Sequence, residues 1–387
     1  MAGSRGRRRG RSARRSVLVV AASVVVAVGT VTGMIKALDD GSGTNSAQRP
    51  DATGATLLVP LPEVPSASNS PSAKASSSAR PKRTATTGTT RKPQRTATVS
   101  PRLYRHPESQ VLEWVRDHPD DPRTEVIADR IADQPAAVWF ADFTPSTITS
   151  RVRAVTSGAA AQGRVPVVVP YAIPDRDCGG ASEGGASDFA AYDDWIDNFA
   201  AGLGSHEVVV ILEPDSIAQA DCLDDTQRAE RFEALARAGR VLKAADPQAR
   251  VYYDAGHSDW NPAGQQAALL KQAGAASAES SDGIFSNVSN FHTTSAEIAY
   301  DRQVLDALGG PAGLGAVIDT SRNGNGAPAD GEWCDPAGRR IGRAPTLSTG
   351  EARIDAYLWV KLPGESDGCK GAPGTFSPSY AYDLASS

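Results

Sequence analysis

Patterns that bind a metal ion or a nucleotide cofactor are missing from this 387-residue sequence. Its four cysteines lie too far apart for a zinc site, in which two cysteines have two to four residues between them. None of its five histidines is followed four positions later by another, so the His-x3-His pattern of a helical metal site is absent. No Gly-x-Gly-x-x-Gly motif follows the first expected strand, which argues against a dinucleotide-binding fold. These absences argue against a zinc site and against a dinucleotide cofactor.

Acidic residues are absent from residues 1–15, which carry seven arginines. Residues 16–36 follow as an apolar run in which the last residue, Lys36, is the first charged one. A basic stretch and an apolar run fit either a signal peptide or an uncleaved anchor. The run is long enough to span a membrane and no clean Ala-x-Ala site follows it, so we favour the anchor. In both cases the rest of the chain is expected outside the cell, secreted or tethered to the membrane only by this segment.

Residues 37–102 contain too few apolar residues to form a core, and their Ser, Thr, Pro and Ala predict a disordered linker. Residues 103–387 are long enough for one α/β barrel, so we expect a single catalytic domain there. The first 102 residues hold 17 Lys and Arg against 4 Asp and Glu, and the remainder holds 23 against 41. A domain this acidic does not bind nucleic acid through phosphates and suits a neutral ligand such as a sugar, although solubility alone also explains the charge.

All four cysteines lie in the part of the chain that is expected to fold. An even number of cysteines in an exported protein indicates two disulfides, for which three connectivities are possible. Sequential pairing is the simplest of the three. We therefore predict disulfides between Cys178 and Cys222 and between Cys334 and Cys369.

Expected strands and helices alternate along the folded part, which predicts a parallel sheet with right-handed crossovers. Residues 225–245 form the longest expected helix, and Thr294 with Glu297 resembles a capping box at the start of another. Periodicity alone leaves a closed barrel and an open doubly wound sheet as alternatives. The seven expected strands lie at 136–142, 165–171, 208–212, 251–254, 284–291, 316–320 and 357–362.

Acidic residues repeatedly follow the apolar strands. The run Val208–Leu212 leads directly into Glu213-Pro214-Asp215. Acids at the carboxyl ends of several parallel strands predict an active face at that end of a barrel. Hydrolysis of a glycosidic bond requires two carboxyl groups, and tryptophans offer flat apolar faces to sugar rings. The other acids at strand ends are Asp177, Asp254, Asp319, Glu365 and Asp367, and the tryptophans near strand ends are Trp139, Trp260, Trp333 and Trp359.

Seven short motifs in this sequence resemble those of glycoside hydrolase family 6, the inverting β-1,4-glucanases, and occur in the family's order over nearly all of 108–387. The resemblance implies a distorted seven-stranded parallel β/α barrel of the TIM-barrel type. It also implies endoglucanase or cellobiohydrolase activity on cellulose, a β-1,4-glucan partner, and no metal or cofactor. The motifs are YAIPDRDCGG, ILEPDS, YYDAGHSDW, NVSNF, VIDTSRNGNG, EWCDPAGRRIG and WVKLPGESDGC.

The resemblance also assigns roles to individual residues. Asp215 matches the general acid, and Asp177 matches the carboxylate that keeps this acid protonated and joins the water network. Asp367 matches the proposed base, with proton transfer through water to Asp177 as the rival, and Tyr171 lies beside the scissile sugar. Asp254 is expected to support the site from within the binding cleft. The remaining substrate-binding residues are expected to be Trp139, His257, Trp260, Asn290, Trp333, Lys361 and Glu365.

One position departs from the family pattern. Some members have a catalytic-loop serine six residues after the aspartate that matches Asp177, and this sequence has Glu183 there with Ser182 just before it. A proton relay through serine therefore requires Ser182 to substitute.

The sequence also predicts whether glucan chains are cut at internal bonds or from their ends. The spacing from Asp319 to Asp367 is short and no long insertion interrupts the motifs, so an open cleft and endo action are expected. The protein is also expected to be a monomer. The alternatives are an exo-acting cellobiohydrolase and a non-catalytic carbohydrate-binding envelope protein.

Overall fold

The computed structural model describes residues 102–386. The predicted basic segment 1–15, the apolar segment 16–36 and all but the last residue of the linker 37–102 lie outside the described residues. Among the helices of residues 102–386, none is both long and apolar enough to cross a membrane.

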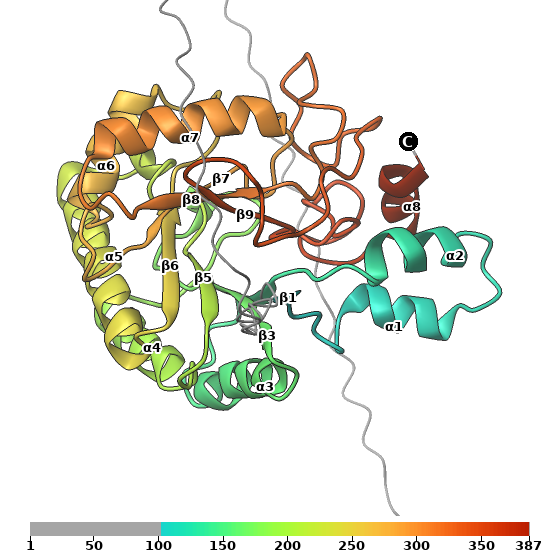
Figure 1. Cartoon of the computed structure of the whole chain (residues 1–387), viewed down its shortest axis with the longest axis horizontal. Helices are drawn as coiled ribbons and strands as arrows, with labels where there is room; N and C mark the ends of the chain where they lie inside the picture. Colours follow the sequence, from blue (N-terminus) through green and yellow to red (C-terminus); the bar gives the residue numbers. More distant parts are fainter. Residues whose placement is uncertain (1–101, 387) are drawn as a thin grey trace, which may run out of the picture. The chain divides into compact units, whose positions relative to one another are not determined.

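A seven-stranded sheet of parallel strands in the order β2-β4-β5-β6-β7-β8-β9 forms the centre of the domain. The sheet curls into part of a barrel (Figure 1). No ladder connects its first and last strands within residues 102–386, but the residues next to them are joined by a backbone hydrogen bond of 2.9 Å from Ala137 N to Trp359 O. The predicted distorted α/β barrel of seven strands is therefore confirmed. The strands are β2 (Val138–Phe140), β4 (Val167–Pro170), β5 (Val208–Leu212), β6 (Ala249–Asp254), β7 (Gly283–Ser286), β8 (Gly315–Asp319) and β9 (Ile354–Leu358).

Strand β5 shows why an uninterrupted apolar run is needed at the centre of the sheet. All five of its residues are buried. Successive side chains of a strand point to opposite faces, so Val208, Val210 and Leu212 pack toward the outer helices, and Val209 and Ile211 fill the barrel interior. Both faces are covered, as is usual for parallel sheets.

Helices surround the outer face of the curled sheet (Figure 1). Helix α5 has the predicted bounds because Asp224 caps its first turn and Gln227 completes a capping box. The other surrounding helices are α3 (Ile148–Ala160), α4 (Phe189–Ala200), α6 (Ala263–Gln272) and α7 (Thr294–Leu308), and α5 spans Asp225–Ala245.

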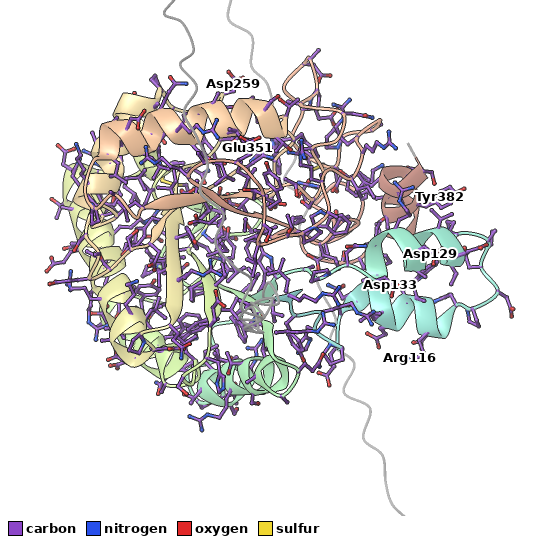
Figure 2. The ribbon with its side chains drawn as sticks, viewed as in Figure 1. Arg116, Asp129, Asp133, Asp259, Glu351 and Tyr382 are labelled. Carbon is purple, nitrogen blue, oxygen red and sulfur yellow. A yellow bond between two sulfur atoms is a disulfide. The ribbon has the colours of Figure 1, made fainter. Side chains whose placement is uncertain are left out.

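A second, smaller apolar cluster lies beside the barrel, where the N-terminal and C-terminal helices meet (Figure 1, and Figure 2 with the side chains). Val111 and Ile127 contribute to this cluster from the N-terminal side, and Tyr380 and Leu384 from the C-terminal side. Its elements are α1 (Gln110–Asp117), α2 (Thr124–Ile127), the π-helical turn Ala128–Ala132 and α8 (Pro378–Ser386), while β1 (Arg102–Leu103) pairs with β3 (Arg164–Val165).

Two local predictions around β7 and α7 were wrong. The strand expected at 284–291 ends at Ser286, because Asn287 and Ser289 adopt left-handed backbone conformations with φ of 64° and 58°. The cap of α7 is Thr293, whose hydroxyl accepts from the amide of Ala296, and not Thr294.

The two disulfides pair as predicted, Cys178 with Cys222 and Cys334 with Cys369. They close segments with sequence separations of 44 and 35 residues. If the entropy of the unfolded chain dominates, replacing either pair by alanines should lower the free energy of unfolding by about 4 kcal/mol. Urea unfolding of the two double variants measures this loss. A loss below about 1 kcal/mol for either pair would contradict the expectation from loop entropy.

Candidate active site

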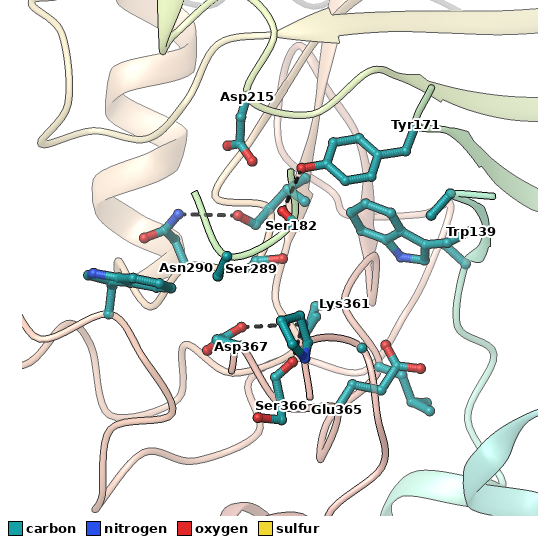
Figure 3. Close-up of a pocket in the computed structure, with 18 of the residues that line it drawn as sticks. Trp139, Tyr171, Ser182, Asp215, Ser289, Asn290, Lys361, Glu365, Ser366 and Asp367 are labelled. Carbon is teal, nitrogen blue, oxygen red and sulfur yellow. Dashed lines mark hydrogen bonds and ion pairs between the residues drawn. The ribbon is translucent and has the colours of Figure 1, made fainter. Parts of the chain in front are cut away.

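A cavity of about 1300 Å³ opens at the carboxyl ends of the strands (Figure 3). Its lining residues follow β2, β4, β5, β6, β7 and β9 in turn, as Trp139, Tyr171, Asp215, His257, Asn290 and Lys361. Of the predicted catalytic and substrate-binding residues, Asp254 is absent from the lining. The others that line it are Asp177, Trp260, Trp333, Glu365 and Asp367.

Two buried carboxylates shape the turn that presents Asp215. Glu213 accepts hydrogen bonds from the amides of Ala172 and Ile173, at 2.9 and 3.1 Å, and so joins the end of β5 to the end of β4. Its burial raises its pKa to about 7. Asp254 accepts from the amides of Ile217 and Ala218, at 3.0 and 2.8 Å, on the other side of the turn. The structure therefore places Asp254 behind the cavity wall, where it holds the Asp215 loop and does not face the cavity.

Asp215 faces the cavity on the side opposite Asp367 and Lys361 (Figure 3). Removal from water raises the pKa of its carboxyl group well above the usual value, and the negative charges of Asp254 and Asp177 raise it further. Lys361 opposes these effects only in part. These surroundings favour the protonated form of the carboxyl group, which is the form that can donate a proton.

Asp177 lies in a chain of hydrogen bonds with two hydroxyl groups. Its Oδ2 accepts from the amide of Ser182 at 2.7 Å and from the Ser182 hydroxyl at 2.9 Å. The Tyr171 hydroxyl lies 3.0 Å from Ser182 Oγ (Figure 3). Since the Ser182 hydrogen is given to Asp177, Tyr171 donates to Ser182. Glu183, at the position where some family members have serine, also lines the cavity.

Arg176 holds the loop of Asp177 in place. Its guanidinium donates to the carbonyl of Ala141 at 2.6 Å and to that of Ser182 at 2.8 Å, and stacks over the Tyr171 ring at 4.6 Å. Asp177 itself has a left-handed backbone with φ of 57°. These contacts, together with the disulfide at Cys178, fix a strained turn in a single arrangement.

Asp367 is held by two cations at the opposite side of the cavity. Its Oδ2 accepts from Arg322 Nη1 at 2.7 Å, and its Oδ1 lies 3.2 Å from Lys361 Nζ. The Arg322 side chain is fully buried, stacks over the Phe291 ring at 4.4 Å and donates to the carbonyl of Ser289. Arg322 was not among the predicted site residues, although it lies in the motif VIDTSRNGNG.

Asp335 organises the backbone around Asp367. Burial opposes its charge, but hydrogen bonds from Ser366 and from three backbone amides outweigh this effect and lower its pKa. The amide donors are Asp367 at 2.8 Å, Cys369 at 3.0 Å and Lys370 at 2.9 Å. Asp335 was not predicted as a site residue either, because a carboxylate that binds backbone amides has no sequence motif of its own.

Aromatic side chains supply flat surfaces around the cavity. Trp139 meets the Tyr171 ring edge-on at 5.2 Å and donates from Nε1 to the carbonyl of Val360 at 2.8 Å. His257 stacks on His292 at 4.2 Å, and burial, followed by the neighbouring His292, lowers its pKa to about 4. Trp333 is 57% exposed at the cavity. The surfaces are therefore apolar or neutral, as sugar rings require.

Within residues 102–386, no group of three or more His, Cys, Asp or Glu side chains is arranged to hold a metal ion.

The fold and the site together define a class of carbohydrate-cleaving enzyme, in which carboxyl groups gather at the open end of a parallel β/α barrel. The sequence profile of glycosyl hydrolases family 6 matches residues 93–383. The chain belongs to this family and is a glycoside hydrolase.

Three relatives document the family membership. Endoglucanase 1 of Streptomyces sp. (strain KSM-9) is 55% identical over 287 residues, 74% of this chain and 78% of the relative. Endoglucanase A of Thermobispora bispora is 50% identical over 284 residues, 73% of this chain, and the match spans 61% of that relative's length. The solved structure of the endoglucanase Cel6 from Mycobacterium tuberculosis, in complex with methyl-cellobiosyl-4-deoxy-4-thio-β-D-cellobioside, has 40% identity and a TM-score of 0.69. It covers 75% of this chain and 97% of that one.

Proposed function

We propose that this protein hydrolyses internal β-1,4-glucosidic bonds in cellulose or related β-glucans with inversion of configuration. The observation that carries the proposal is Asp215, a carboxyl group whose burial and neighbouring charges favour its protonated form, facing a cavity that also contains the Asp177–Ser182–Tyr171 chain. The endoglucanase names of the bacterial relatives and the thio-oligosaccharide bound to the Mycobacterium tuberculosis enzyme support the choice of substrate and of endo action.

In this proposal Asp215 protonates the departing glycosidic oxygen. Water attacks the opposite face of the sugar and gives its proton to Asp177, directly or through Ser182. Within the described residues no protein donor reaches Asp177 Oδ1, so this oxygen is free to accept from water.

Asp367 is the alternative proton acceptor. Its Oδ2 already accepts from Arg322 and from the amide of Asp335, at 2.7 and 3.1 Å, and its Oδ1 meets Lys361. Fewer lone pairs are left on Asp367 than on Asp177. We therefore assign the water-activating step to Asp177 and a sugar-binding role to Asp367 together with Lys361.

The sugar units are proposed to bind along the aromatic surfaces of Trp139, His257, Trp260 and Trp333, with Asn290 and Glu365 binding hydroxyl groups. We also propose that the enzyme acts outside the cell as a monomer, tethered or released according to the fate of residues 16–36.

The purified protein should lower the viscosity of carboxymethylcellulose faster than it releases reducing ends, because cuts at internal bonds shorten chains before many ends form. During early turnover of cellohexaose, proton NMR should detect the α-anomer first, since a single displacement inverts the anomeric centre. Release of cellobiose alone would indicate the exo-acting alternative. A first-formed β-anomer would contradict inversion, and binding without any hydrolysis would indicate a carbohydrate-binding protein.

A further inference from the structure

Gln110, the first residue of helix α1, connects this helix to a distant loop of the active site. Its amide nitrogen donates to Glu365 Oε1 at 3.3 Å and to the carbonyl of Gly374 at 2.7 Å. Its amide oxygen accepts from the amide of Phe376 at 3.0 Å. One side chain therefore makes three hydrogen bonds to a segment more than 250 residues away in the sequence.

Gln110 contacts both ends of one loop, residues 365–376. Glu365 and Phe376 pair as an antiparallel bridge, and the amide of Ser366 donates to the carbonyl of Thr375 at 2.9 Å. Gln110 contacts both sides of this closed loop. The loop carries Asp367 and Cys369, so its position sets one wall of the cavity.

Helix α1 is well placed to act as a fixed support. Val111, next to Gln110, is 1% exposed in the apolar cluster between the N-terminal and C-terminal helices. Residues on both sides of the contact, including Gln110, Glu365 and Gly374, line the cavity. In Figure 3 Glu365 lies on the far side of the cavity from Asp215. The contact is thus part of the cavity wall but distant from the acid.

The charged groups around Glu365 leave its orientation dependent on Gln110. Burial raises the pKa of Glu365 to about 7, while Lys361, Arg322 and the Gln110 hydrogen bond oppose this effect and Asp367 adds to it. Within residues 102–386, no direct contact of the Glu365 side chain to Lys361 or Arg322 reaches ion-pair distance, whereas the bond to Gln110 does reach hydrogen-bond distance.

We infer that Gln110 is a positioning residue for sugar binding, which aims the Glu365 carboxylate and the 365–376 loop at a glucosyl hydroxyl group. Gln110 acts through Glu365 and need not touch the reacting atoms. This inference rests on the proposed glucanase function, since the ligand of Glu365 is a glucosyl unit of the glucan substrate.

The experiment compares Gln110→Ala with the control Gln303→Ala, an exposed glutamine on α7 that bonds only its own helix, to the carbonyl of Ala299 at 3.0 Å. Gln110→Ala should raise KM for cellohexaose about three- to tenfold with a smaller change in kcat, because a hydrogen bond used equally in the ground and transition states is lost. Gln303→Ala should leave both constants unchanged. Wild-type hydrolysis of cellohexaose tests the proposed function separately.

A double-variant cycle with Glu365→Ala decides whether Gln110 acts through Glu365, because alanine removes the oxygen to which Gln110 donates. The two effects on KM should be strongly non-additive, so that Gln110→Ala changes KM less than about twofold in the Glu365→Ala background. Additive effects, or a Gln110→Ala enzyme with wild-type KM, would overturn the inference even if the wild type is an active glucanase.

Gln110→Glu provides a second variant that keeps the acceptor for the Phe376 amide, should the alanine variant fold poorly. A second carboxylate beside Glu365 raises the pKa of Glu365, so the midpoint of the pH dependence of KM should move to higher pH. A Gln110→Glu enzyme with a lower melting temperature but the KM of the wild type at every pH would count against positioning.

Discussion

Asp215→Asn is expected to lower the rate of hydrolysis of unactivated β-glucans by about 10²- to 10⁴-fold, the usual worth of general acid help to a poor leaving group. The amide has the size of the carboxyl group and cannot donate a proton to the departing oxygen. Burial and the charges of Asp254 and Asp177 raise the pKa of Asp215 and so favour the protonated form that the reaction needs.

Comparison of two substrates isolates the role of the proton. The loss should be large with cellohexaose and small with an aryl cellooligoside, whose leaving group departs without protonation. Asp221→Asn, an exposed aspartate in the turn after the same strand, serves as the control and should retain full activity. Equal losses with both substrates would contradict the acid role and point to a disturbed site.

Asp177→Asn gives a contrasting result within the same experiment. Because Asp177 raises the pKa of Asp215, its neutral replacement should let Asp215 lose its proton at lower pH. The acid must be protonated to act, so the basic limb of the pH–rate profile should move to lower pH. Activity should fall with both substrates, since water activation is lost as well.

Much of this fold can be predicted from short stretches of sequence, because the strands and helices concerned are determined by residues that are close together in the sequence. The apolar run Val208–Leu212 is buried along its whole length, and the helix at 225–245 has its predicted bounds because its cap lies next to it in the sequence. The end of β7 could not be predicted in this way. Asn287 leaves the strand because its side chain donates to the carbonyl of Asp319 at 2.9 Å, a contact 32 residues away.

The active site likewise has features that the sequence predicts and features that it does not. The resemblance identifies the cavity residues by type, but the function of a carboxylate depends on its direction. Asp254 turns toward the backbone amides of Ile217 and Ala218 and away from the cavity, which no motif reveals. Ser182 takes the contact to Asp177 because the loop folds back on itself, so the shift of one position against the family pattern does not remove the hydroxyl group.

Arg322→Met is expected to have the largest effect on stability. The Arg322 side chain is 0% exposed, pairs with Asp367 at 2.7 Å and lies 4.0 Å from Asp335 Oδ1. Methionine fills similar space but leaves two carboxylates at the site with Lys361 as the remaining cation near Asp367. Removing one partner of a buried ion pair costs about 3–5 kcal/mol, because the buried carboxylates lose their main counterion and water does not replace it.

The matched control for this variant is Arg302→Met, which breaks the ion pair of 2.9 Å between Arg302 and Glu351, with side chains 38% and 43% exposed. Water solvates the groups that remain there, so the loss should stay below about 1 kcal/mol. Denaturant unfolding of both variants measures the two losses in the free energy of unfolding. At equal slopes of free energy against denaturant concentration, each loss follows from the shift of the unfolding midpoint. Arg322 also joins the loops after β7 and β8 to that of Asp367, through Ser289, so its replacement should reduce glucan hydrolysis in protein that is still folded. Equal stability losses in the two variants would show that the buried pair at Asp367 is solvated like a surface pair, and would remove the argument that Arg322 fixes this wall of the active site.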